Sequence, residues 1–262
     1  MTSQSHGGIV RIGRLFYAAG ITAIGAQTLV NGDFVSVIIP ALPAWVPGHA
    51  LWVYLCAFGL IFCGAAILVG IRARPAALVL GSALLVCLVL VHLPEHFAGS
   101  DRSAASWVLP FKVLTLAGGA FVSAVSLRDG PQGAADRRMV AFGCVALGAT
   151  CVDFGIDHFI YADFVATLVP AWISGHMFWT YFCGVALIAA GVGMILRIKA
   201  RLASGLLGAM IFVWLLVLHI PRAIADPVSG HGNEPTSVCE ALSFSGIALM
   251  LSRMLPGWDA PR

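Results

Sequence analysis

The chain has 262 residues, of which 60% are hydrophobic and 10% are charged. A soluble domain carries about 25% charged residues, so this composition excludes an ordinary water-soluble globular protein and predicts that the partner of the chain is a lipid bilayer. The formal net charge of +3 is small, so we do not expect the protein to bind nucleic acid.

Eight runs of the chain are expected to span the membrane, since a spanning helix needs about 20 mostly apolar residues. Five runs carry no charge, and three contain ionisable residues. We therefore expect an all-α, polytopic membrane protein with eight transmembrane helices. No signal-peptide cleavage site follows the polar first residues, so the first spanning helix is expected to be the targeting signal. In chain order the runs are 15–30, 51–69, 76–93, 107–127, 139–161, 177–196, 202–220 and about 236–251.

Basic residues of the connections are concentrated on one side of the expected membrane. Twelve of them fall on the side of both termini, and only Arg102 and Arg222 fall on the other side. Because short basic loops stay in the cytoplasm, we expect a multi-pass protein of the cell inner membrane with both termini cytoplasmic. The twelve are Arg11, Arg14, Arg72, Arg74, Arg128, Arg137, Arg138, Arg197, Lys199, Arg201, Arg253 and Arg262.

One stretch of the chain occurs twice. Residues 44–94 align without a gap with residues 171–221, at an offset of 127. Four helices per copy predict two parallel four-helix repeats, related by an axis along the membrane normal. We expect the first repeat at 1–127, a cytoplasmic linker at 128–138 and the second repeat at 139–262. Identical pairs include Trp45/Trp172, His49/His176, Trp52/Trp179, Cys56/Cys183, His92/His219 and Pro94/Pro221.

Seven of the eight histidines are expected near the outer ends of the helices. As an amphipathic side chain, histidine suits the headgroup level, but it is also the usual switchable proton carrier and a common metal ligand. The sharper interpretation is a polar cavity that opens outward, with His49, His92, His176 and His219 on facing halves. The sequence has no HExxH motif and no Cys/His cluster with zinc spacing, so no metal site is predicted.

Ionisable residues inside spanning helices are costly and indicate function by default. Asp153 and Asp157 lie four residues apart on one face of the fifth expected helix, and His158 is adjacent. The matching positions of the first helix carry no charge, which favours one asymmetric site over two equal ones. The alternative is a structural role, in which Asp153 forms a hydrogen bond to a neighbouring helix.

Lys112 and Glu240 occupy equivalent positions of the two halves and carry opposite charges. An isolated lysine in lipid is expensive, so a partner is expected. We predict a Lys112–Glu240 ion pair close to the outer end of a central cavity. Asp157 is the rival partner for the lysine.

Each half contains three short sequence motifs of low specificity, which follow Pro40 in the first half and Pro170 in the second. The motifs are AWVPGH, CAFGLIFCGAAIL and ARPAALVLG in the first half, and AWISGH, GVALIAAGVGMIL and ARLASGLLG in the second. They resemble the DoxX-like family of four-helix membrane units, over about residues 12–127 and 139–252. The resemblance implies a link to quinone-coupled oxidation, with quinone as the cofactor and a membrane or extracytoplasmic oxidoreductase as the partner. It assigns no catalytic residue.

The leading hypothesis is a redox-associated or quinone-interacting accessory subunit with an outward-facing polar site. An acid and histidine cluster inside a membrane can relay protons. A transporter or binding protein for a small solute, and a scaffold without catalysis, remain open as alternatives, so the sequence does not decide whether the chain is an enzyme. The predicted polar, proton-handling site comprises Asp153, Asp157, His158, His176, His219, Glu240, Lys112, His49 and His92.

Overall fold

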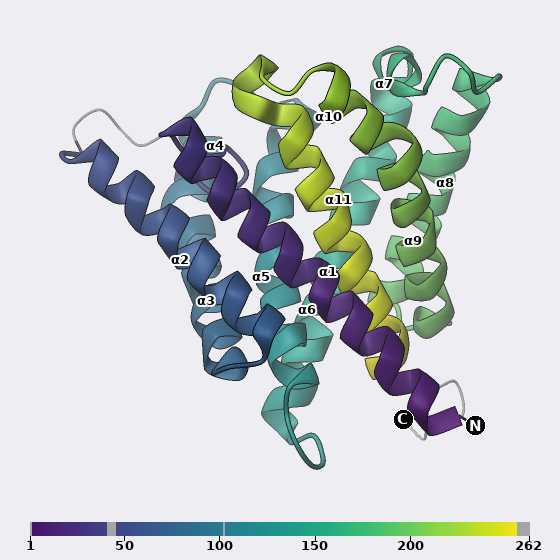
Figure 1. Ribbon diagram of the computed structural model, residues 1–262. Coiled ribbons are helices and arrows are strands. Elements are labelled where there is room, and N and C mark those ends of the chain that lie inside the picture. The colour runs from purple at the N-terminus through teal and green to yellow at the C-terminus, as the bar shows by residue number, and fades with distance from the viewer. Residues whose placement is uncertain (1, 41–45, 102, 256–262) are drawn as a thin grey trace.

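The computed structural model describes residues 2–40, 46–101 and 103–255, and side chains 2–6 and 231 are outside the description. Trp45, Arg102 and Arg262, which the sequence analysis used, therefore lie outside the described residues. The described residues form helices and no strand. The all-α prediction is thus confirmed, and Figure 1 shows the helices gathered into one bundle.

The first half of the bundle is built from three long helices and one helix that is interrupted by a π-helical turn. The turn precedes Pro94, which lacks a backbone N–H, and a widened turn accommodates the carbonyl that proline leaves without a donor. The elements are α1 Thr2–Asn31, α2 His49–Val69, α3 Ala73–Cys87, the π-turn η1 Leu88–His92, α4 Leu93–Ala98, the 3-10 turn η2 Ala104–Trp107 and α5 Val108–Ser126.

The second half follows the same order and adds one short helix after its first long helix. A π-turn again precedes a proline, here Pro221. The elements are α6 Ala134–Ile160, α7 Ala162–Leu168, α8 His176–Ile195, α9 Ala200–Trp214, the π-turn η3 Leu215–His219, α10 Ile220–Ala225 and α11 Ser229–Met254.

Seven helical segments among the described residues are long and apolar enough to cross a membrane. The prediction of a polytopic membrane protein is confirmed. The eighth predicted run forms α11, whose N-terminal part is polar and contains Pro235, and α11 is not among the seven. Helix α11 packs against α1, α5 and α9, so protein rather than lipid surrounds much of its length.

The turns that begin corresponding helices are alike in the two halves. Gly48 precedes α2 with φ 76° and Gly175 precedes α8 with φ 75°. Glycine reaches this left-handed region without the steric cost that other residues meet. Arg72 and Lys199 adopt φ 50° and 48° before α3 and α9. The same local conformations therefore recur 127 residues apart.

Corresponding helices also have corresponding neighbours. Helix α1 packs against α2 and α11, and α6 packs against α8 and α5; likewise α3 packs on α5, and α9 packs on α11. The first helix of each half thus packs on the last helix of the other half. These relations are compatible with two repeats, and the division into repeats at 1–127 and 139–262 with a linker at 128–138 stays a prediction.

Small residues allow the two crossings between the halves. A Cβ added at Gly13 would meet the backbone of Gly246 where α1 crosses α11, and one added at Gly118 would meet Gly143 where α5 crosses α6. Close backbone approach at small residues is a common way for helices to associate in lipid. The two halves therefore pack against each other at the α1–α11 and α5–α6 crossings.

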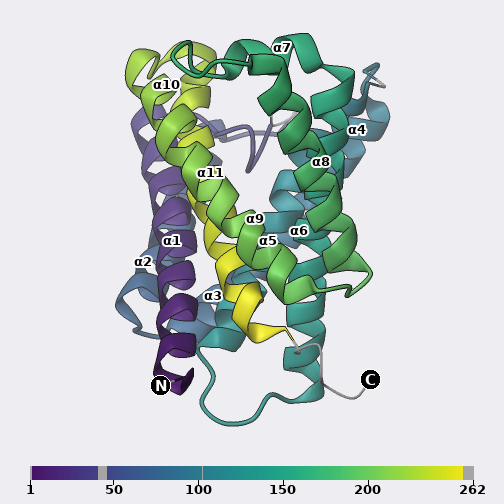
Figure 2. The same cartoon turned by 90° about the vertical axis from the view of Figure 1, so that its right-hand side faces the viewer.

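The two ends of the bundle differ. Helix α1 begins and α11 ends at the same end, whereas the short helices α4, α7 and α10 lie at the opposite end (Figures 1 and 2). We call the second one the short-helix end. It is the end that the sequence analysis expects to be extracytoplasmic, and that orientation stays a prediction.

Candidate functional site

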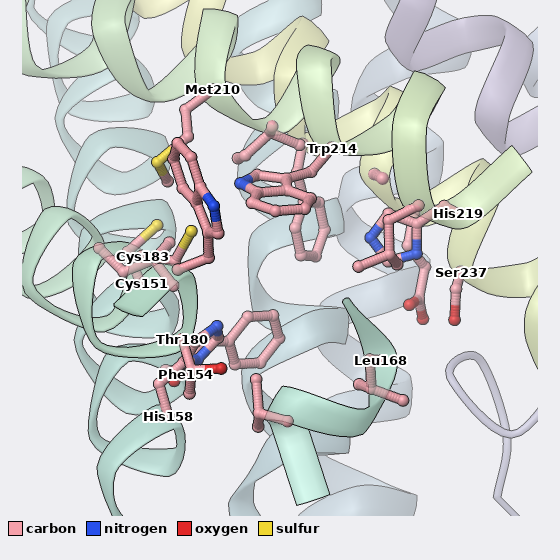
Figure 3. A pocket seen from close by; sticks show the side chains of 18 of the residues that line it. Cys151, Phe154, His158, Leu168, Thr180, Cys183, Met210, Trp214, His219 and Ser237 are labelled. Atoms are coloured by element: carbon pink, nitrogen blue, oxygen red, sulfur yellow. Dashed lines mark hydrogen bonds between the residues drawn. The ribbon is translucent and has the colours of Figure 1, made fainter. Parts of the chain in front are cut away.

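A cavity of about 270 Å³ lies in the second half of the molecule. Helices α5, α6, α8, α9 and α11 form its walls, and the segment around α7 borders it (Figure 3). Most of its lining is aliphatic, aromatic or sulfur-containing. The side chains that bring polar groups are Lys112, Thr150, His158, Trp179, Thr180, Trp214, His219, Ser237 and Glu240.

The cavity gathers some of the predicted site residues and not others. Four predicted residues line it: Lys112, His158, His219 and Glu240. Its two histidines both come from the second half, so it does not match the expected arrangement of histidines on facing halves. The predicted residues outside its lining are Asp153, Asp157, His176, His49 and His92.

The predicted ion pair between Lys112 and Glu240 is confirmed. Lys112 Nζ lies 2.7 Å from Glu240 Oε2, and the two side chains are only 18% and 6% exposed. The pair joins α5 to α11, which pack against each other. Glu240 Oε1 is buried and has no hydrogen-bond partner among the described residues. A buried ion pair needs further hydrogen bonds to offset desolvation, so this oxygen is a site for a donor.

The two histidines lie on opposite sides of the cavity (Figure 3). His158 projects from α6, and its Nδ1 lies 2.7 Å from the carbonyl oxygen of Phe154. His219 ends the π-turn η3, and its Nδ1 is buried without a partner among the described residues. Both rings therefore have a nitrogen that can serve a ligand.

Asp153 and Asp157 lie on another face of α6 than the residues that line the cavity. Cys151, Phe154 and His158 share the cavity face. Asp153 Oδ2 and Asp157 Oδ1 are buried, and neither has a hydrogen-bond partner among the described residues. The proposed hydrogen bond from Asp153 to a neighbouring helix is therefore absent for this oxygen.

The other three histidines of the predicted site, His49, His92 and His176, lie outside the cavity lining. His49 Nε2 lies 3.2 Å from Asp33 Oδ1 in a half-exposed pair, and His176 begins α8 at the short-helix end. His92 is buried, with Nε2 3.0 Å from the carbonyl oxygen of Ile38. The Nδ1 atoms of His92 and His219 are both buried without a partner among the described residues, so the two histidines differ in the contact of His92 Nε2 with the Ile38 carbonyl oxygen.

In the first half, the described part of the segment before α2 packs into the hydrophobic core. Val35, Val37 and Ile38 are buried in the hydrophobic core. The Ile38 carbonyl oxygen accepts a hydrogen bond from Cys87 Sγ at 2.9 Å, besides its contact with His92. The segment is thereby held against the third helix.

A tryptophan occupies the position of Cys87 in the second half. Trp214 follows Cys87 by 127 residues and lines the cavity. Cys87 contacts the Ile38 carbonyl oxygen, whereas the larger indole of Trp214 lies in the cavity wall.

The tripeptide Asp33-Phe34-Val35 recurs as Asp163-Phe164-Val165, at an offset of 130. Phe34 is 8% exposed, whereas the matching Phe164 is 65% exposed. Phe164 of α7 is therefore turned outward, whereas Ala162, Ala166 and Val169 of the same segment are buried.

The sequence analysis did not single out several cavity residues. Trp179 and Trp214 have ring centroids 6.2 Å apart in an edge-to-face arrangement, and both line the cavity together with Thr180 and Ser237. The available signal was the departure of the second copy from the first, where Trp214 replaces Cys87 and Thr180 replaces Val53.

Comparison with protein families matches residues 9–93 to the DoxX family. No curated protein and no solved structure matches the chain. The matched residues cover α1, α2, α3 and η1, and every residue that lines the cavity lies after them. The resemblance predicted from the motifs is thus confirmed for this region alone: the chain is a polytopic membrane protein in which residues 9–93 match the DoxX family.

Proposed function

We propose that the protein is a redox-associated membrane subunit that binds the head group of a quinone in the cavity of its second half. The observation that carries this proposal is the combination of an apolar, aromatic cavity with two histidines and a buried ion pair. Ligand sites in proteins are mostly apolar pockets with a few polar groups that orient the ligand.

The size and walls of the cavity suit a single ring. Its volume of about 270 Å³ lies just below the roughly 300–1,000 Å³ of typical ligand pockets. Trp179, Trp214, Phe154 and Phe244 offer ring faces and edges, which favour aromatic partners in offset or edge-to-face contact. A quinone ring carries two oxygens on opposite sides, and His158 and His219 lie on opposite sides of the cavity.

The polar groups support proton handling at such a ring. Histidine changes its charge near neutral pH, and the Lys112–Glu240 pair supplies a fixed donor and a free carboxylate oxygen. Reduction or oxidation of a quinone moves protons together with electrons. A membrane or extracytoplasmic oxidoreductase would exchange the electrons, in line with the DoxX resemblance.

The two alternatives from the sequence account less well for the same features. A transporter that rocks two equal halves around a central site would place groups from both halves around the cavity, but most of its lining comes from the second half. A scaffold would be more stable with the cavity filled, since cavities and unpaired buried polar groups both cost stability.

Quenching of tryptophan fluorescence by a short-chain benzoquinone tests the proposal on the purified protein in detergent. Trp179 and Trp214 line the cavity, so we expect saturable quenching. Cys183→Leu adds volume to the cavity wall and should weaken binding about tenfold, because overpacking displaces the ligand or the wall. The matched control Cys56→Leu changes the aligned residue of the first half and should leave binding unchanged. Linear, non-saturating quenching, or equal effects of the two variants, would refute the proposal.

A further inference from the structure

The hydroxyl groups that line the cavity have already used their protons. Thr180 donates to the carbonyl oxygen of His176 at 3.0 Å, and Ser237 donates to that of Asn233 at 3.0 Å. Thr150 lies within hydrogen-bond distance of two carbonyl oxygens, at 2.9 and 3.0 Å. A hydroxyl has one proton and two lone pairs. These side chains therefore present only acceptors to a ligand.

The contact of His158 with its own helix fixes its tautomer. A carbonyl oxygen can only accept, so the proton must lie on Nδ1, which is 2.7 Å from the Phe154 oxygen. In a neutral imidazole the other nitrogen is then an acceptor. His158 Nε2 is therefore available to a ligand that brings a proton.

Glu240 adds the strongest acceptor of the cavity. Its Oε2 is bound to Lys112, whereas its Oε1 is buried without a partner among the described residues. Hydrogen bonds to an ionised group are stronger than those between neutral groups, and an unsatisfied buried charge is costly. A ligand that donates to this oxygen would gain affinity.

Donors are also present but are fewer. They are the remaining protons of Lys112 Nζ and the indole N–H group of Trp179, since the indole N–H of Trp214 is paired with the Cys183 sulfur. His219 can donate or accept, depending on its tautomer. A ligand that matches these cavity groups needs at least one hydroxyl group that donates a hydrogen bond. The oxygen of that hydroxyl can at the same time accept a hydrogen bond from Lys112.

We propose that the cavity selects the reduced, dihydroxy form of the ring, a quinol, over the quinone. This proposal rests on the proposed function. Quinone oxygens only accept, and they leave His158 Nε2 and Glu240 Oε1 without donors. Quinol hydroxyls donate to these two atoms and accept from Lys112 or an indole. A site built to receive a hydroxyl rejects an analogue that lacks it, so we expect the quinol to bind at least about tenfold more tightly.

Anaerobic titration of the full chain in detergent tests the proposal. The same short-chain benzoquinone is added in its oxidised form and, after chemical reduction, in its reduced form, and tryptophan quenching gives both Kd values. His158→Phe removes the acceptor and should abolish most of the preference. The matched control His176→Phe makes the same change at a histidine outside the cavity lining and should keep the preference.

A second variant replaces a hydrogen-bond acceptor of the cavity with a possible donor. Glu240→Gln can turn an amide donor toward the ligand, so the preference should move toward the quinone. If either cavity variant fails to fold, the ratio of the two Kd values in the wild-type protein still decides. Saturable binding with the quinone equal to or tighter than the quinol overturns the proposal while the proposed function stands. Failure of both forms to bind overturns both.

Discussion

The two halves of the molecule share their helix neighbours, their turn conformations and their π-turns, but they treat one segment differently. Before α2 the segment around Ile38 is buried and bound to the third helix. At α7 the matching segment has Phe164 exposed, and Val165, Leu168 and Val169 line a cavity. The exchange of Cys87 for Trp214, which lines this cavity, is one of the sequence differences between the two copies. A symmetric frame can thus acquire a site in one half through changes in side chains.

The largest effect is expected at the ion pair, where equivalent positions of the halves carry opposite charges. Lys112→Met leaves Glu240 buried without its partner, and breaking such a pair costs about 3–5 kcal/mol. The double variant Lys112→Met/Glu240→Met should cost much less than the sum of the two single changes. Thermal unfolding in detergent measures all three, and additive losses would show that the pair is not coupled.

A tryptophan in the first half tests whether side-chain size separates the halves. Cys87→Trp should displace the segment around Ile38 and destabilise the protein by up to about 3 kcal/mol, as overpacked cores do. Val89→Trp lies on the same π-turn at an exposed position and serves as the control with little expected change. Equal unfolding midpoints for the two variants would contradict the role given to Trp214.

Glycine substitutions test what the halves share. Gly13→Ala and Gly143→Ala would each place a methyl group against the backbone of a crossing helix. Overpacking outweighs the gain in helix propensity, so each should cost on the order of 1 kcal/mol. Gly59→Ala, where a Cβ meets nothing within 4 Å, should not destabilise. Unequal losses at Gly13 and Gly143, measured by thermal unfolding, would weaken the equivalence of the crossings.

The smallest effect is expected in the exposed loop before α11. The backbone N–H of Ser229 donates to Asp226 Oδ1 at 3.1 Å and lowers the pKa of this carboxyl from its ordinary value of 3.8. A lowered folded-state pKa gives stability that is present at neutral pH and is lost as the pH falls through that pKa. Asp226→Asn should therefore lower the unfolding midpoint slightly at pH 7, and the difference from the wild type should be smaller at pH 3, below the ordinary pKa of 3.8. A difference of equal size at both pH values would contradict this account.

The frame of the molecule follows from the sequence because it depends on patterns that the chain repeats. Apolar runs predict the helices, and opposite charges at equivalent positions predict the pair of Lys112 with Glu240, which the structure confirms. Hydropathy alone does not identify α11 as a membrane-spanning helix over its full length, because its N-terminal part is polar and it packs largely against other helices.

The cavity could not be predicted in the same way. The cavity exists only if the segment at Leu168 does not pack into the core as the segment at Ile38 does. Such packing depends on the shapes of the neighbouring side chains, including Trp214, in three dimensions. The face of α6 that meets the cavity also depends on helix rotation, which placed His158 in its lining and left Asp153 and Asp157 outside. The exchange of Cys87 for Trp214 is visible in the sequence, but it is one of many differences between the two copies.

Photolabelling with an azido-benzoquinone tests the central claim most directly, because the two halves supply the comparison within one chain. The purified protein is irradiated with the probe, and labelled peptides are located by mass spectrometry. We expect saturable labelling on the cavity walls of α6, α8 and α9, competed by unlabelled ligand, and little on the aligned residues of α1, α2 and α3. Equal competed labelling of both halves, or labelling that excess ligand does not reduce, would contradict a single site in the second half.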